Sequence, residues 1–169
     1  MKLIEAMKKI KELRVKAEDL RKKVGTYCAD QSHETPVYPD QKAKVREWTQ
    51  SYSDILKEIL SLRVAIQKTN LATDVTVELG GKQVTKTIAE WIHRRRDLAE
   101  LERSVWDSIG DRGLREGTVQ TSTGEKTEVK IRRYYDPEER DNKVELFRSE
   151  PSVIDRTLEV INAVTDLVE

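Results

Sequence analysis

Apolar side chains between residues 45 and 66 recur in alternating steps of three and four residues without interruption. They are Val45, Trp48, Tyr52, Ile55, Ile59, Leu62 and Ile66. This spacing places one side chain per turn on the same side of a helix. Asp40 precedes the segment and is a good N-cap. We therefore predict a helix of about 29 residues and about 43 Å. Leu56, Leu60 and Val64 widen its apolar stripe, so it is expected to contact more than one neighbour.

Residues 2–24 show a similar pattern and predict another amphipathic helix. Its apolar positions are Leu3, Met7, Ile10, Leu13, Ala17, Leu20 and Val24. Gly25 is expected to end this helix, and residues 25–39, which have no period, are predicted as a loop. The two helices should fold back as an antiparallel, coiled-coil-like hairpin. The apolar surface left over on such thin rods favours self-association, so we predict a homo-oligomer.

After Asn70 the apolar period changes from 3.6 to 2. Val75, Val77 and Leu79 alternate with polar residues before Gly80-Gly81, which predicts a short β-hairpin. A third helix is expected from about residue 87, capped by Thr85 or Thr87, to about residue 109.

A second hairpin is predicted around Thr123-Gly124, with its return strand alternating from Val129 to Tyr135. Asp136-Pro137 then forms a strong helix start. Pro151 is expected to separate a short helix from a last helix over residues 151–168. The expected fold class is mainly α: a long antiparallel helical hairpin, a third helix, two small β-hairpins and a C-terminal helical pair. Residues 1–169 are interpreted as a single domain, with residues 1–110 and 111–169 as its two parts.

Charge and composition restrict the classes of partner. The 31 basic and 31 acidic residues cancel, which argues against a protein that binds duplex DNA. No apolar run approaches the roughly 20 residues of a membrane span, and the charged start has no signal-peptide h-region. The single Cys28 excludes an intrachain disulfide framework. We therefore expect a cytoplasmic protein without a membrane partner.

Enzyme signatures are absent from the sequence. His33 and His93 are far apart and neither has metal-ligand spacing, while Gly80-Gly81 is not followed by the residues of a phosphate-binding loop. Nothing resembles a nucleophile elbow. The sequence thus predicts a non-enzyme with no catalytic residue, metal or cofactor.

The segment from Trp91 to Asp97 places permanent charge where a helix should be apolar. Arg95 and Glu102 fall in the middle of the apolar side of the third helix, and Arg94 and Arg96 flank it. A buried guanidinium cannot lose its proton, so it needs an anionic or carbonyl partner. One interpretation is a structural ion network, in which Arg95 pairs with Glu102 or with an acid of the first helix, Glu18 or Asp19.

The other interpretation is an anion pocket. The segment Arg132-Arg133-Tyr134-Tyr135 is a second basic and aromatic patch. Guanidinium groups match phosphate oxygens, and aromatic rings stack on nucleobases. If the second hairpin folds against the third helix, one cleft would collect both patches. The candidate ligand-binding residues are Trp91, Arg94, Arg95, Arg96, Arg132, Arg133, Tyr134 and Tyr135.

Three motifs carry a resemblance to a known family. The opening Met1–Met7, the Thr69-Asn70 pair and Arg95-Arg96-Asp97 resemble an uncharacterised bacterial and phage family whose members are sometimes labelled septicolysin. The resemblance is best over residues 1–110. It implies a helical-hairpin core with small β-hairpins and a tendency to oligomerise, but no established activity.

Two functional hypotheses follow. The first is a non-catalytic oligomeric protein that binds and sequesters a phosphorylated, nucleotide-derived signalling molecule, such as a phage protein that blunts a bacterial defence pathway. The second is a structural or interaction protein, a helical adaptor without a small-molecule ligand. The two differ in what the inward-facing arginine contacts.

Overall fold

The computed structural model describes residues 1–168 and divides them into two compact units. The first unit contains residues 1–73 and the described residues from 159 onward, and the second contains residues 74–158. Helices make up most of both units, and the two small two-stranded sheets lie in the second, so the predicted mainly α fold class is confirmed. No helix within residues 1–168 has the length and apolar character to span a membrane. The single-domain interpretation stays a prediction.

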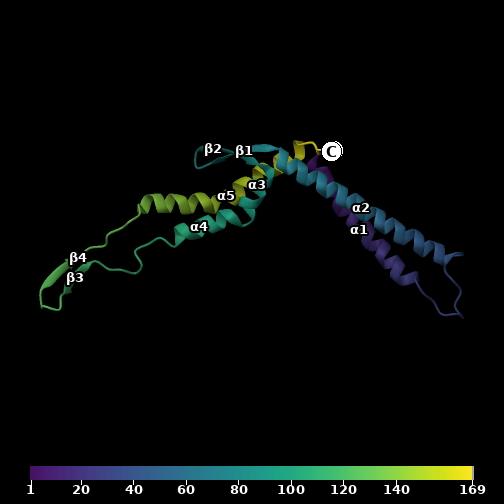
Figure 1. The fold of residues 1–169 in the computed structure, drawn as a ribbon, viewed down its shortest axis with the longest axis horizontal. Helices are drawn as coiled ribbons and strands as arrows, with labels where there is room; N and C mark the ends of the chain where they lie inside the picture. The colour runs from purple at the N-terminus through teal and green to yellow at the C-terminus, as the bar shows by residue number, and fades with distance from the viewer. Residues whose placement is uncertain (169) are drawn as a thin grey trace. The chain divides into compact units, whose positions relative to one another are not determined.

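The first unit is built on an antiparallel helical hairpin (Figure 1). Helices α1 (Leu3–Tyr27) and α2 (Gln41–Ala72) pack along each other. Asp40 caps α2 as predicted, because its Oδ1 accepts a hydrogen bond from the Ala43 N–H at 2.9 Å. Gly25 does not end α1, which continues to Tyr27.

The core of the first unit is narrow. Its buried residues on the two helices are Leu3, Ala6, Leu13, Ala17, Trp48, Ile59 and Thr69. At the loop end, the rings of Tyr27, Tyr38 and Trp48 contact one another with centroid distances of 5.4–5.7 Å. A pair of helices buries only the side chains on its mutual seam, which leaves their other faces exposed.

The two chain ends meet in the first unit. Leu3 donates its N–H to the Thr165 carbonyl at 3.0 Å, and Leu167 donates to the Met1 carbonyl at 2.8 Å. Helix α5 (Pro137–Val164) consequently ends at Val164 rather than at the predicted residue 168, because the following backbone pairs with the N-terminus.

The second unit begins with the predicted β-hairpin. Strands β1 (Asp74–Leu79) and β2 (Lys82–Thr87) pair from Asp74–Thr87 to Leu79–Lys82. Gly80 and Gly81 have φ values of 56° and 76°, which is the left-handed conformation of a tight hairpin turn. The inward side chains Val75 and Val77 are buried.

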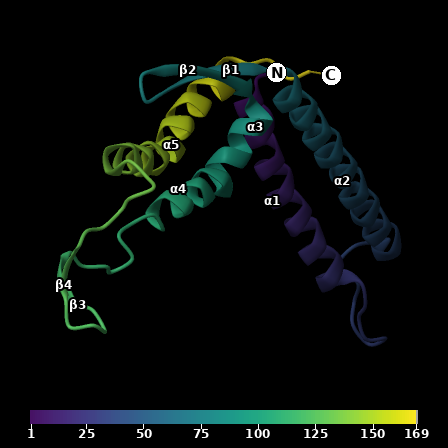
Figure 2. The same ribbon diagram turned by 60° about the vertical axis from the view of Figure 1, so that its left-hand side comes forward.

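The third helix is a continuous rod from α3 into α4 (Figure 2), and one turn in its middle is wider than an α-helical turn. Helices α3 (Ile88–His93) and α4 (Ala99–Asp107) are joined by a π-helical turn, η1 (Arg94–Leu98). Within that turn the Ala99 N–H bonds the Arg94 carbonyl five residues earlier. Thr87 starts the rod in a capping box with Glu90, as predicted for one of the two candidate caps.

The second hairpin is shorter than predicted. Strands β3 (Gly117–Gln120) and β4 (Lys126–Val129) are exposed along their whole length. The return strand ends at Val129, so the expected alternation as far as Tyr135 is wrong. With no buried face to hold it, the pairing does not extend beyond the turn-proximal residues.

Helix α5 replaces the predicted C-terminal helical pair. Asp136 caps it by accepting a hydrogen bond from the Glu138 N–H, and Pro137 is its first residue, as expected. The helix continues through Pro151, so the predicted break is wrong. Proline removes one backbone bond, and the buried side chains on both sides, among them Val144 and Ile154, favour a continuous helix.

Candidate functional site

The π-helical turn makes Arg94, not Arg95, the inward-facing arginine. Only 18% of the Arg94 side chain is exposed, against 42% for Arg95. A π-turn adds one residue to a helical turn, so every later residue is rotated relative to a regular helix. Leu98 and Val105, which a regular helix would place on the same side as Trp91, are therefore exposed, whereas Ala99 is buried. The prediction that Arg95 lies at the centre of the buried face is wrong for this reason.

Carboxylates occupy the position that a bound anion would take beside Arg94. Its Nε and Nη2 donate to Glu150 Oε1 and Oε2, both at 2.7 Å. Its Nη1 forms an ion pair with Glu102, and the Phe147 ring centroid lies 5.8 Å from its Cζ. The Glu150 side chain is 3% exposed, which leaves this carboxylate little access to water. Two carboxylates therefore satisfy this guanidinium from within the protein.

The same contacts stabilise the protonated, charged form of Arg94. The hydrogen bonds with Glu150, and secondly with Glu102, raise the pKa of Arg94 above its ordinary value, while burial acts in the opposite direction. Arg94 is thus a permanent cation in a neutralised network. An ion network is present, but its predicted pairs are wrong: Arg95 contacts Asp155, and Glu102 pairs with Arg94. Glu150 is the partner that sequence reasoning missed.

Other residues of the first patch have separate environments. Arg95 donates to Asp155 at 2.7 Å, on the exposed surface of α5. Arg96 is exposed. Trp91 is 0% exposed, and its indole N–H donates to the Val75 carbonyl at 2.9 Å. Its ring is part of the core, so the expected role of Trp91 as an open stacking surface does not fit its position.

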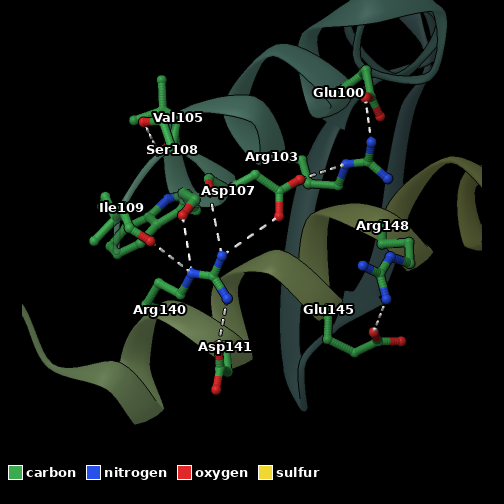
Figure 3. Close-up of polar contacts among 11 residues, drawn as sticks. Glu100, Arg103, Val105, Asp107, Ser108, Ile109, Arg140, Asp141, Glu145 and Arg148 are labelled. Carbon is green, nitrogen blue, oxygen red and sulfur yellow. Dashed lines mark hydrogen bonds and ion pairs between the residues drawn. The ribbon is translucent and has the colours of Figure 1, made fainter. Parts of the chain in front are cut away.

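The Arg140 side chain also connects α5 to the end of α4 (Figure 3). Arg140 Nε donates to the carbonyls of Trp106 and Ile109 at the end of α4, each at 3.2 Å, and its Nη1 pairs with Asp141. Arg103 pairs with Glu100 on the same helix. The Trp106 carbonyl also accepts the Ile109 N–H at 3.2 Å, and carbonyls at a helix end are not satisfied within the helix. Arg140 therefore adds a capping donor from another helix.

The second basic patch forms a pocket of its own, of about 350 Å³. The lining residues are Ile109, Gly110, Asp111, Arg112, Leu114, Ile131, Arg132, Arg133, Tyr134 and Tyr135. Residues 91–96 do not contribute to it. The single cleft expected to combine the two patches is therefore not formed within the described residues.

Asp111 organises one wall of this pocket. Arg133 binds both of its carboxylate oxygens, at 2.8 and 2.6 Å, and the Tyr135 hydroxyl donates to Oδ1 at 2.8 Å. The hydrogen bonds from Arg133 and then Tyr135 lower the pKa of Asp111, and the bond to Asp111 raises the pKa of Tyr135. By contrast, Tyr134 is 88% exposed.

Signals for the missed partners were present in the sequence. Glu150 lies four residues before Ile154 and Arg140 four residues before Val144, so each is close to the apolar side of α5. The expected helix break at Pro151 obscured this shared face. Within residues 1–168, no cluster of three or more histidine, cysteine or acidic side chains has a geometry suited to a metal ion.

Comparison with known proteins identifies a family and one solved structure with a similar fold. No curated protein matches the sequence. A crystal structure described as a functionally unknown conserved protein from Corynebacterium diphtheriae is similar, with a TM-score of 0.57, 20% identity and 99% of each chain covered. At this identity the likeness shows the fold alone. The septicolysin label that accompanies the sequence resemblance is attached to neither match. A family model matches residues 10–167, and the chain therefore belongs to the family described as a family of unknown function (DUF6847).

Proposed function

We propose that this chain is a non-catalytic, homo-oligomeric interaction protein whose α1–α2 hairpin packs against the hairpin of a second copy. The exposed surface carries this proposal. The chain exposes 12,450 Å², whereas two separate globules of half its mass would expose roughly 10,300 Å² together. The excess of roughly 2,000 Å² per chain is larger than the roughly 800 Å² that each partner loses in a standard interface, so one chain has enough surplus surface to form one.

The exposed apolar positions on α2 have the geometry of a helix–helix contact. Leu56, Leu60 and Val64 are 46%, 63% and 42% exposed, and their spacing of four residues aligns them in one stripe. This stripe lies beside the seam with α1 rather than on it. A two-helix layer needs a second layer to cover such a face, and two hairpins together make a four-helix bundle.

A groove beside this stripe fits a second copy of the same surface. It has a volume of about 300 Å³ and is lined by Arg14, Ala17, Glu18, Tyr52, Leu56, Ile59, Leu60 and Arg63. Its floor is apolar and its rim has charges of both signs. In a two-fold assembly the same patch meets itself, so cations of one rim can lie opposite the carboxylate of the other. The chain as a whole is neutral, so no net repulsion opposes association.

The arginine network supports an interaction role over sequestration at the third helix. Glu150 and Glu102 already bind Arg94, so an anion would have to displace a carboxylate that is almost fully buried. Leaving that carboxylate unpaired costs about 3–5 kcal/mol. We therefore infer that Arg94 has a structural role.

Light scattering of the purified full chain at micromolar concentration tests the proposal. We expect a mass of at least twice 19.6 kDa for the wild type. Leu56→Glu combined with Leu60→Glu should give a folded monomer, because both side chains are exposed within one chain. Val15→Glu is the matched control: Val15 is 63% exposed and lies on the side of α1 opposite Leu13 and Ala17.

Two results would count against it. A monomeric wild type would reject the oligomer. An unchanged oligomeric mass in the Leu56→Glu, Leu60→Glu protein, with Val15→Glu also unchanged, would reject the hairpin as the interface.

A further inference from the structure

The turn before the second hairpin has an arginine in an unusual backbone conformation. Leu114 donates its N–H to the Asp111 carbonyl at 2.9 Å, and Arg112 and Gly113 between them have φ values of 57° and 72°. Two positive φ values define a turn that favours glycine or asparagine at both central positions. The equivalent turn between β1 and β2 has glycine at both. Among described non-glycine residues, Arg112 alone has a positive φ.

Backbone strain of this kind clusters at functional sites, and Arg112 lines the pocket of residues 109–135. The cations of the pocket differ in availability. Asp111 engages Arg133, but neither Arg112 nor Arg132 has an ion-pair partner within residues 1–168. Counting Asp111 as the one acid and three arginines as cations, the lining has a net charge of +2.

The rest of the lining is apolar and aromatic. Ile109, Leu114 and Ile131 supply aliphatic surface, and Tyr134 presents a largely exposed ring. Guanidinium groups bind phosphate oxygens with two parallel hydrogen bonds, and an exposed aromatic ring can stack on a planar heterocycle. A pocket of about 350 Å³ is within the size range of small-molecule sites.

We propose that this pocket binds a small phosphorylated molecule that carries an aromatic ring, with Arg112 and Arg132 holding the phosphate and Tyr134 contacting the ring. The pocket is formed by residues 109–135 alone. The inference therefore does not rest on the self-association proposed above.

Calorimetric titration of the full chain with ADP tests the site, with pyrophosphate and adenosine as partial probes. We expect saturable binding of ADP, weaker binding of pyrophosphate and the weakest binding of adenosine. Arg112→Asn should weaken ADP binding at least tenfold while the melting temperature stays the same or rises, because asparagine tolerates the left-handed backbone better than arginine. A purely structural arginine would not show this opposite pair of effects.

Three further variants keep the result interpretable. Arg112→Lys retains the charge and should restore part of the affinity. Arg132→Ala lies outside the turn and should weaken ADP binding to a similar degree even if Arg112→Asn misfolds. Arg115→Ala removes an exposed cation near the pocket that does not line it, and should change nothing.

Absence of saturable binding of both ADP and pyrophosphate would overturn the proposal, as would wild-type affinity in Arg112→Asn and Arg132→Ala. Loss of affinity in Arg115→Ala equal to that in Arg112→Asn would indicate nonspecific attraction and would also overturn it. We expect these variants to leave the mass measured by light scattering unchanged. A failure of the ADP site can therefore be told apart from a failure of the proposed oligomer.

Discussion

Arg94 and Glu150 are 56 residues apart in sequence, and their side chains form a bidentate salt bridge in which both N–O distances are 2.7 Å. The pair joins the π-helical turn of the third helix to α5. The Glu150 side chain is 3% exposed, so water cannot solvate its carboxylate. The buried charge is therefore compensated by the Arg94 guanidinium.

Replacement of Arg94 should destabilise the fold strongly. Arg94→Ala leaves the Glu150 carboxylate buried and without its cation, so we expect a loss of about 3–5 kcal/mol in the free energy of unfolding. Arg95→Ala, which breaks the exposed pair with Asp155, should cost less than about 1 kcal/mol. Urea denaturation of the two variants measures the difference, and equal losses would contradict the structural role of Arg94.

Replacing both partners should rescue much of that loss. Arg94→Met with Glu150→Leu removes the charges and keeps apolar volume, and such exchanges of buried ion pairs are often neutral or stabilising. We expect the double variant to be more stable than Arg94→Ala in the same denaturation experiment. A double variant as unstable as Arg94→Ala would show that backbone packing, not charge, is the source of the loss.

The π-helical turn η1 in the third helix should tolerate deletion of one residue. Removing Arg96, an exposed residue of η1, converts the π-turn to a regular turn and leaves the faces before and after it nearly unchanged. We expect a cooperative thermal transition and a loss below about 2 kcal/mol.

Deletion of Ser104, in regular helix, is the comparison. It rotates Trp106 and Ile109 by about 100° relative to Ala99, so we expect a loss of more than about 4 kcal/mol or no cooperative transition. Similar melting curves for the two deletions would argue against the π-turn as an inserted residue.

Acid should weaken the Asp111 contacts. Hydrogen bonds from Arg133 and Tyr135 lower the pKa of Asp111 in the folded state, so the unfolded chain binds more protons near the ordinary value. The stabilisation is complete above about pH 4 and is lost as the pH falls through the folded-state pKa. The stability difference between wild type and Asp111→Asn should therefore shrink below about pH 4, as followed by urea denaturation at several pH values. A constant difference would contradict this assignment.

Tyr135 should respond in the alkaline range. Its hydrogen bond to Asp111 raises its pKa, so its stabilising effect is present at neutral pH and is lost as the pH rises through that raised value. In an absorbance titration, one tyrosine should ionise above the ordinary value of about 10. The late step should move towards that value in Asp111→Asn, and its persistence there would point to a different tyrosine.

Restoring the backbone bond at Pro151 should stabilise α5. Pro151→Ala allows an N–H to reach the Phe147 carbonyl and removes the clash of the ring with it. We expect a gain of about 1–3 kcal/mol. Ser152→Ala, at the next and exposed position, should change the stability by less than about 0.5 kcal/mol. A loss on Pro151→Ala would show that packing of the proline ring outweighs the missing bond.

Local patterns were sufficient for the elements whose signals do not depend on distant residues. The hairpin helices follow from apolar spacing, the first β-turn from Gly80-Gly81, and the starts of α2 and α5 from Asp40 and Asp136. Pro151 was the misleading local signal. Its helix-breaking tendency is worth only a few kcal/mol, which apolar burial along the rest of α5 can exceed.

The candidate site was less predictable, for a geometric reason. A helical wheel assumes a constant 100° per residue, and one π-turn moves Arg95 off the buried face and Arg94 onto it. Glu150 was not assigned as the partner because nothing local ties residue 150 to residue 94. Residues 132–135 of the second patch line one pocket, and their role in binding stays a prediction. The turn conformation at Arg112 was not foreseen.

The sequence alone determined the helical class and the hairpin, because these depend on periodicity and on residues within a few positions of one another. Tertiary structure decided which arginine is neutralised and which remain available. That outcome depends on which carboxylate, 56 residues away in the case of Glu150, the fold brings within hydrogen-bond distance.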